Sequence, residues 1–104
     1  MRIPQSINIG AHTITIEYQS GMFAYNQAFG VFDAEELKII IDADINESLK
    51  VETFWHEVIE ALNFFCEAAM DHSKIQIFGV LLHQIAESME KDSQNENINK
   101  KKRR

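Results

Sequence analysis

The spacing of apolar residues changes once along the chain, from every second residue to every third or fourth. Residues 6–18, S-I-N-I-G-A-H-T-I-T-I-E-Y, alternate apolar and polar side chains, which is typical of strands exposed on one face. From Glu47 onward the apolar residues follow in steps of three to five, which is typical of a helix. This order predicts an α+β domain in which a small antiparallel sheet of three to four strands packs on two helices.

Two pairs of strands are predicted in the first half of the chain. Gly10-Ala11 is the predicted turn between the first two strands. The second pair is predicted over residues 28–33 and 37–43, after a loop over residues 19–26. The run of isoleucines at residues 39–41 is continuously apolar, which favours a strand that is buried on both faces.

Two helices are predicted in the second half of the chain. The first covers about residues 47–69, and either Asp44 or Asn46 is expected to cap its first turn. The second covers about residues 73–91, where Gly79 costs about 1 kcal/mol that a close helix–helix approach would offset. The predicted apolar stripes are Leu49, Phe54, Val58, Leu62, Phe65 and Ala69 on the first helix, and Ile75, Phe78, Leu82, Ala86 and Met89 on the second.

Charge is distributed unevenly over the 104 residues, which fit a single domain predicted over residues 1–91. Residues 92–104, D-S-Q-N-E-N-I-N-K-K-K-R-R, contain one apolar residue and are predicted to be a disordered polar and basic tail. Residues 1–99 contain 16 acidic and 5 basic side chains, a net charge of −11. This acidic body disfavours direct contact with nucleic acid. It favours either a basic protein surface as partner or simple solubility.

The sequence also bears on the compartment. It contains no apolar run long enough to span a membrane and no apolar signal-peptide core. The single cysteine, Cys66, excludes an internal disulfide and agrees with a reducing compartment. A cytoplasmic protein without membrane contact is therefore expected.

The stretch T-F-W-H-E-V-I-E-A-L-N-F-F-C-E, residues 53–67, combines an apolar helix pattern with an imidazole and two carboxylates. His56 and Glu60 are four residues apart, so on a helix they present their ligand atoms to one place. Glu57 is rotated from His56 by about 100° and reaches the edge of the same zone. The pattern is that of the H-E-x-x-H zinc helix with its second histidine replaced by glutamate. The alternative is an ordinary surface pair worth a few tenths of a kcal/mol.

A catalytic zinc ion accepts two histidines and one glutamate and leaves a fourth position open for water. A second histidine is therefore needed. His72 follows in the turn after the first helix, where the chain reverses toward the preceding face, and His83 inside the second helix is the other candidate. With His56, Glu60 and His72 as ligands, Glu57 would take a proton from water and pass it to a leaving amine. An edge strand of the sheet would hold the peptide beside the metal.

Four segments, taken in order, resemble the small zincin-like proteins of phages and prophages, distant relatives of SprT-like and ImmA/IrrE-like metallopeptidases. I-N-I-G-A-H-T-I-T-I-E-Y resembles the opening strands of that family, and F-G-V-F-D-A-E-E-L-K-I-I-I-D-A its glycine-led strand pair. E-T-F-W-H-E-V-I-E-A-L-N-F resembles its metal helix, and M-D-H-S-K-I-Q-I-F-G-V-L-L-H-Q the turn and helix that follow. The resemblance covers about residues 3–90.

The resemblance implies a minimal zincin-like domain that binds one zinc ion per chain. His56 and Glu60 match the helix ligands, and Glu57 matches the general base. His72 matches a histidine found at this turn in family members that carry glutamate at the second ligand position. Members with two helix histidines take their third ligand from an acid on the next helix, which makes Glu87 an alternative to His72.

Two functions are compatible with the resemblance. The first is a small phage-encoded zinc-binding protein that inhibits a host defence factor, as anti-CRISPR proteins do, and its acidic body suits the basic channel of a CRISPR RNA-guided nuclease. The second is a minimal zinc metallopeptidase. The short chain favours the first, because little remains beyond the sheet and two helices to build specificity pockets. Either protein is expected in the host cytoplasm, and the oligomeric state is left open.

Overall fold

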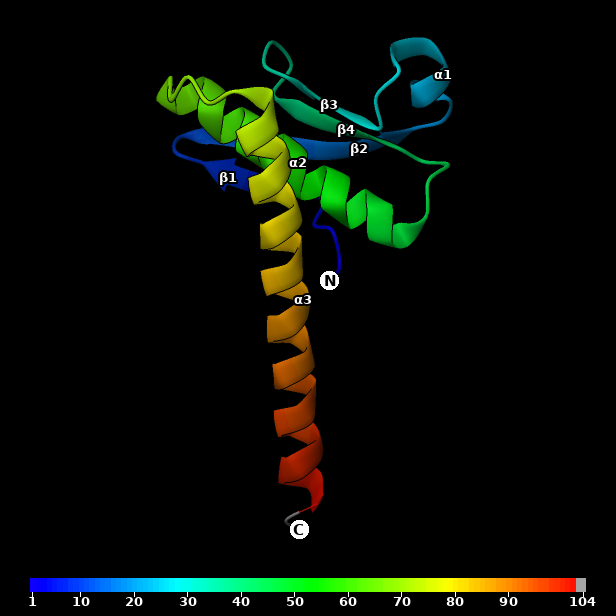
Figure 1. Ribbon diagram of the computed structural model, residues 1–104, viewed down its shortest axis with the longest axis vertical. Coiled ribbons are helices and arrows are strands. Elements are labelled where there is room, and N and C mark those ends of the chain that lie inside the picture. Colours follow the sequence, from blue (N-terminus) through cyan, green and yellow to red (C-terminus); the bar gives the residue numbers. More distant parts are fainter. Residues whose placement is uncertain (103–104) are drawn as a thin grey trace.

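The computed structural model describes the backbone of residues 1–102 and the side chains of residues 1–24 and 27–91. In chain order (Figure 1) its elements are β1 (Ser6–Ile9), β2 (His12–Gln19), α1 (Met22–Asn26), β3 (Gly30–Asp33), β4 (Lys38–Asp42), α2 (Glu47–Cys66) and α3 (His72–Lys102). The predicted α+β architecture, in which strands are followed by two packed helices, is confirmed.

The four strands form one mixed sheet in the order β1-β2-β4-β3. β1 pairs antiparallel with β2, and β3 pairs antiparallel with β4, as the sequence predicted. The central pair, β2 and β4, is parallel, which the sequence pattern did not reveal. The short helix α1, which occupies part of the predicted loop, lies on the connection that carries the chain from β2 to the outer edge of the sheet. β4 then returns beside β2 in the same direction.

The core lies between the sheet and α2, which covers one face of it (Figure 1). Its fully enclosed members are Ile14, Ile16, Ile39, Ile41 and Phe54, each at most 9 % exposed. Side chains alternate between the two faces of a strand, so Ile40 points away from α2, and it is only half-buried. The prediction that the isoleucine run is buried on both faces was therefore wrong, because α2 covers only one of them.

α2 begins at the predicted residue. Asn46, one of the two candidate caps, accepts a hydrogen bond from Leu49 N at 2.8 Å through its side chain. The helix ends at a left-handed residue, Glu67, with φ 49°. Its buried residues are Val51, Thr53, Phe54, Glu57, Ile59 and Ala61. Leu62, which the sequence placed in the apolar stripe, is instead 42 % exposed.

α3 packs across α2 and then extends beyond the rest of the molecule (Figure 1). Gly79 lies where the helices meet, and a Cβ on it would lie 3.2 Å from Cα and 3.3 Å from N of His56. The close approach predicted for this glycine is confirmed. The predicted disordered tail, residues 92–104, lies outside the described side chains and stays a prediction. No helix of the described chain is both long and apolar enough to cross a bilayer.

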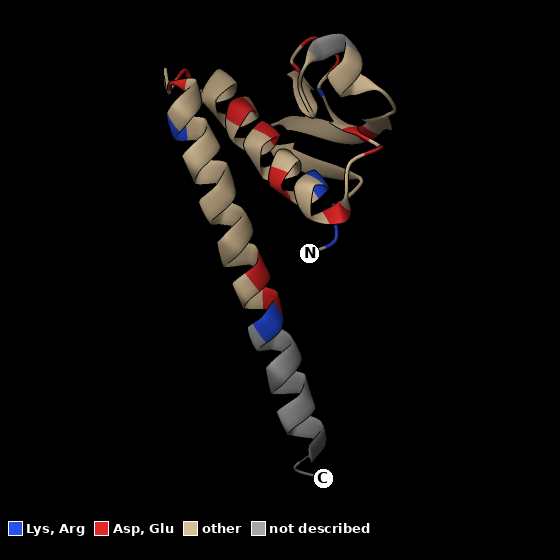
Figure 2. Cartoon of the chain, turned by 45° about the vertical axis from the view of Figure 1, so that its right-hand side comes forward, with Lys and Arg blue, Asp and Glu red and all other residues tan. Residues whose placement is uncertain are grey.

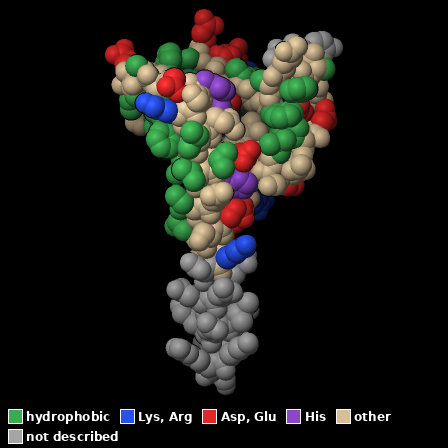
Figure 3. Space-filling view, viewed as in Figure 1, with side chains coloured by type: hydrophobic (Ala, Val, Ile, Leu, Met, Phe, Trp, Pro, Cys, Tyr) green, Lys and Arg blue, Asp and Glu red, His purple; other side chains and the backbone are tan. Residues whose placement is uncertain are grey.

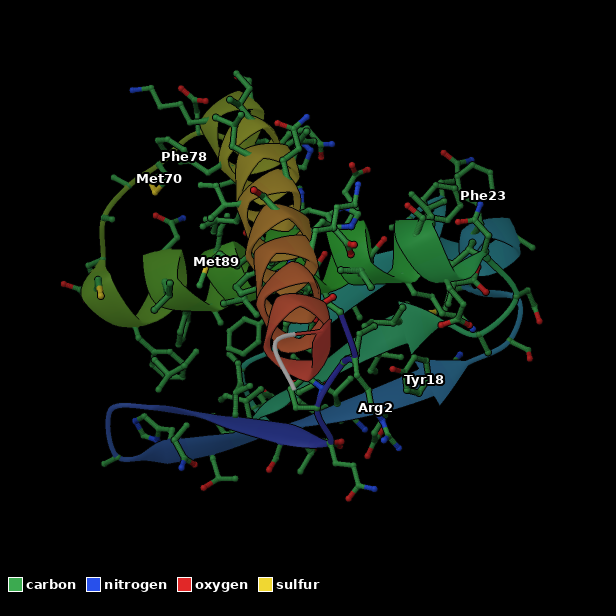
Figure 4. The ribbon with its side chains drawn as sticks, turned by 90° about the horizontal axis from the view of Figure 1, so that it is seen from below. Arg2, Tyr18, Phe23, Met70, Phe78 and Met89 are labelled. Atoms are coloured by element: carbon green, nitrogen blue, oxygen red, sulfur yellow. The ribbon has the colours of Figure 1, made fainter. Side chains whose placement is uncertain are left out.

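A second side of α3 carries a row of exposed apolar side chains, which we call the α3 stripe. It consists of Ile77, Phe78, Leu81, Ile85 and Met89. Phe78 and Met89, expected in the core, are 47 % and 65 % exposed and lie on the same side of the helix (Figure 4). The helical period was correct, but α3 has two apolar faces. Gly79 decides between them, because only its own face permits close contact with α2.

Candidate metal centre

α2 supplies three chemically active side chains to one site. His56 and Glu60 lie one turn apart and line a cleft, with His56 Nε2 3.5 Å from Glu60 Oε1. Glu57 lies beside them, with its Oε2 atom 4.0 Å from the same imidazole nitrogen. The contact with Gly79 seats the backbone of His56 directly against α3. The helical spacing therefore directs His56 and Glu60 to the same side of α2, and the packing of α3 fixes the backbone of His56.

The turn between α2 and α3 brings a fourth side chain to the site. The Asn63 Oδ1 atom accepts a hydrogen bond from Met70 N at 2.9 Å, which draws the turn back onto α2. Asp71 caps the next helix by accepting from a backbone amide of its first turn. His72 is the first residue of α3, and its Nδ1 atom lies 3.7 Å from Glu60 Oε1.

One ligand atom from each of His56, Glu60 and His72 lies within 4.8 Å of the other two. Ligand atoms of a tetrahedral zinc site, with bonds of about 2.0–2.1 Å, are roughly 3.4 Å apart. The His72 side chain is 77 % exposed, so little packing opposes a rotation that closes this difference. Two imidazoles and one carboxylate, with one side open to the cleft, fit zinc. The structure thus brings together the three residues that the sequence singled out as ligands.

The surroundings of the site shift the pKa values of two side chains, His56 and Glu57. Burial lowers the pKa of the His56 imidazole, although the charge of Glu60 opposes this effect, so the ring is neutral at pH 7 and free to bind a metal. Glu57 is 7 % exposed, and burial raises the pKa of its carboxyl to about 7. The charge of Glu60 adds to this rise, while a hydrogen bond from Phe32 N works against it. A carboxyl that titrates near neutral pH suits a general base.

A cleft of about 790 Å³ runs past these residues. β3 and the residues just before it form one wall, α2 forms the other, and the start of α3 closes one side. Figure 3 shows histidine and acidic side chains between the apolar side chains of the two sides. Gly30 lets β3 approach α2, since a Cβ on it would lie 2.5 Å from Thr53 Cγ2 and 3.2 Å from Glu57 Cγ.

β3 is an edge strand, and its free edge faces the cleft. Just before β3, the Phe29 carbonyl accepts a hydrogen bond from Asp42 N, whereas Phe32 N donates to the carboxylate of Glu57. Backbone groups of successive residues point alternately to the two sides of an antiparallel strand. The polar groups of Gly30 and Phe32 therefore point toward the cleft, where an extended peptide can pair with those of Gly30 and with the Phe32 carbonyl.

The two alternatives for the third ligand, His83 and Glu87, lie in a different place. His83 Nε2 is 3.4 Å from Glu87 Oε1, and the amino group of Met1 donates to the carboxylates of Glu87 and Glu90. Neither His83 nor Glu87 belongs to the group of ligand atoms that the described residues form around His56. Of the three candidates, the structure brings only His72 to the site.

Two features of the site were not predicted from the sequence. Glu52 lines the cleft one turn before His56, and its spacing of four residues was the signal that could have found it. The hydrogen bond between Phe32 N and Glu57 had no such signal. It depends on how β3 is placed against α2, which only the folded chain defines.

The arrangement is that of a candidate zinc site that opens into a cleft beside an edge strand. His56, Glu60 and His72 would hold a zinc ion here and leave a fourth position open for water. Comparisons with protein-family models, with curated proteins and with solved structures found no match to this chain. The resemblance to zincin-like proteins therefore stays a prediction from the sequence.

Proposed function

We propose that this chain is a minimal zinc metallopeptidase that cleaves an extended segment of a protein held in the cleft. The observation that carries the proposal is the position of Glu57. Its carboxyl is 7 % exposed, has a pKa of about 7 and lies 4.0 Å from the His56 ligand nitrogen. A solubilising surface glutamate needs neither burial nor a shifted pKa, whereas a general base benefits from both.

His56, Glu60 and His72 would hold the zinc ion. When bound, the zinc supplies Lewis acidity toward the scissile carbonyl and lowers the pKa of water. Glu57 accepts a proton from water and later delivers it to the leaving amine, a shuttle that its near-neutral pKa permits. The hydrogen bond from Phe32 N orients the carboxylate of Glu57 for this task.

The free edge of β3 would hold the substrate. A segment that pairs with the backbone of Gly30 and the carbonyl of Phe32 would lie along the free edge of β3, beside the face of α2 that carries the candidate ligands. Main-chain pairing of this kind fixes the orientation of the segment without requiring deep side-chain pockets. A short chain can therefore position a peptide with few residues of its own.

Mass spectrometry of peptides tests the proposal. The zinc-loaded protein is incubated with a proteome-derived peptide library, and new termini are compared with those from Glu57→Gln. We expect cleavage by the parent and a loss of about 100-fold or more in Glu57→Gln at unchanged zinc content. Cleavage that survives Glu57→Gln contradicts the proposal. A parent that holds zinc at one ion per chain and cleaves nothing contradicts it as well.

A second candidate function is inhibition by binding. It is supported by the acidic body of residues 1–99 and by the unpartnered α3 stripe, which together offer a charged and an apolar surface to a partner. The partner would be a basic host defence protein in the cytoplasm, such as a CRISPR nuclease. Among the described residues, the acidic ones (red in Figure 2) are spread over several elements, including α2 and α3.

The two functions respond differently to the same substitutions. Inhibition by binding survives Glu57→Gln, because binding requires no base. It weakens in Glu35→Lys, which reverses an exposed acid on the β3–β4 turn, and it weakens further as salt is added. An assay of nuclease activity with added protein reads out both variants. Loss of inhibition in Glu57→Gln with zinc retained excludes the binding function.

A further inference from the structure

The cleft has a consistent charge along its length. Three glutamates, Glu52, Glu57 and Glu60, line it, and its lining contains neither lysine nor arginine. Glu57 is more than nine-tenths buried, and the one ion-pair partner that the described chain gives it is the His56 imidazole. A zinc ion at the candidate centre would offset the charges of Glu57 and Glu60, so the charge that the cleft offers its occupant depends on the third glutamate.

Glu52 is the glutamate that the candidate metal centre does not use. It precedes His56 by four residues, so it lies one turn along α2 on the same face, about 6 Å from His56 along the helix axis. The ion pairs of the described residues include Glu60, which contacts His56 and His72, but none that involves Glu52. Its half-buried side chain lines the cleft beyond the metal ligands.

The opposite wall is apolar. Phe29 and Val31 line the cleft on the β3 side and are 36 % and 42 % exposed. Long basic side chains lay their methylene stems on apolar surfaces and direct their charged ends to polar groups. A wall of this kind opposite Glu52 suits a lysine or arginine better than a short or acidic side chain.

We propose that the cleft selects an extended segment that carries lysine or arginine two residues from the residue beside His56. The inference rests on the proposed function, since it describes the segment which that site would take. The spacing follows from geometry. Successive strand residues advance by about 3.3 Å and alternate in direction, so two residues span roughly 6–7 Å and return to the same face. This matches the axial distance of about 6 Å from His56 to Glu52.

Fluorescence anisotropy on the full chain tests the inference. The probes are three labelled peptides with one common sequence that differ only by Arg, Gln or Glu at one position. Glu57→Gln serves as background, to prevent cleavage. We expect the Arg peptide to bind about 10-fold more tightly than the Glu peptide at low salt, with a preference that shrinks as salt is added. Added Glu52→Gln should reduce the preference to less than about 3-fold.

Two further variants make the result specific to the cleft. Glu17→Gln removes the same charge from an exposed residue of β2 that does not line the cleft, and it should leave the preference unchanged. Glu52→Lys should invert the preference in favour of the Glu peptide, which a variant that is merely unfolded cannot do. Equal binding of the three peptides overturns the inference. So does a preference for Arg that is unaffected by both changes at Glu52, or stronger binding of a single-stranded oligonucleotide.

Zinc titration of the same samples separates this inference from the proposed function. Zinc binding without any preference among the peptides leaves the metal centre standing and overturns the selectivity. A preference for Arg that Glu52→Gln removes, in a chain that binds no zinc, supports the cleft as a basic-segment site and contradicts the metallopeptidase.

Discussion

The molecule contains two histidine–glutamate pairs with the same spacing, His56–Glu60 on α2 and His83–Glu87 on α3. Their Nε2–Oε1 distances are 3.5 Å and 3.4 Å, and their histidine side chains are 15 % and 13 % exposed. By sequence spacing and by local geometry the two are equivalent. They differ in what surrounds them, and this difference shows how little the i, i+4 spacing says about metal binding by itself.

The pair on α2 meets a second imidazole, a buried carboxyl and a cleft. The pair on α3 meets a cation, because the amino group of Met1 donates to the carboxylate of Glu87. That ion pair lowers the pKa of the Glu87 carboxyl, mainly through the hydrogen bond from the amino group. Among the described residues a third potential ligand joins the pair on α2, whereas none joins the pair on α3, so we expect zinc only at the first.

The largest expected effect is on zinc affinity, when the histidine of each pair is replaced by alanine. His56→Ala should weaken zinc binding by about 100-fold or more, because an affinity of about 10–16 kcal/mol shared among three or four ligands gives each roughly 3 kcal/mol. His83→Ala, at an equally buried histidine, should leave zinc binding unchanged. Metal content and competition with a chelating dye measure both. Equal losses in the two variants would falsify the distinction.

The fold was predictable to the extent that it depends on local pattern. Alternation over residues 6–18 and the helical period after Glu47 sufficed for the strands, the helices and their order. The parallel pairing of β2 with β4 was not predictable, since it depends on the path of the chain through α1 to the far edge of the sheet. Pairing between distant segments has no periodic signature in the sequence.

The candidate site was predictable where it rests on one helix and its adjoining turn. The spacing of His56 and Glu60 is fixed by the helix, and His72 follows closely enough that a reversal near Met70 brings it back. The burial of Glu57 was not predictable, because it requires β3 to lie against α2 at Gly30. The expectation that Phe78 and Met89 are buried failed for the same reason, because the packing of α3 against α2 selects which apolar face of the helix is buried.

The second effect concerns pH and contrasts Glu57 with Glu87. Burial raises the pKa of Glu57 from 4.5 to about 7, so the stability linked to this group is present at acidic pH and lost as pH rises through 7. For the metal-free chain this amounts to roughly 2 kcal/mol between pH 5.5 and pH 8. The pKa of Glu87 is lowered, so its stabilisation has the opposite sign and is lost as pH falls.

Denaturant unfolding of the metal-free chain at several pH values measures this contrast. Glu57→Gln should remove most of the loss of stability toward pH 8, and subtraction from the parent cancels the opposing titration of His56. Glu87→Gln should instead flatten the acidic side of the profile. A parent that gains stability from pH 5.5 to pH 8 relative to Glu57→Gln would show that Glu57 is not buried as described.

A smaller effect on stability and zinc affinity tests the packing of α3 against His56. In Gly79→Ala the new Cβ meets backbone atoms of His56 at 3.2 Å and 3.3 Å, and backbone cannot move aside locally. Overpacking of about 1–3 kcal/mol exceeds the gain of about 1 kcal/mol in helix propensity, so the net result is destabilisation by about 1 kcal/mol. The displaced α3 carries His72 with it, so zinc affinity should fall as well. Calorimetric unfolding and zinc titration measure the two effects, and a stabilised variant contradicts the close packing.

The smallest effect is expected at Glu87, and it completes the comparison. Glu87→Gln removes a carboxylate that is 42 % exposed, and water and salt screen its ion pairs with Met1 and His83. At pH 7 the melting temperature should change by less than about 2 °C, and zinc content should not change. The matched variant Glu60→Gln replaces the same residue type at the same spacing from its histidine, but it should lose zinc. If Glu87→Gln lowers zinc content as far as Glu60→Gln does, the pair on α3 takes part in metal binding and the surroundings of the two pairs do not decide their roles.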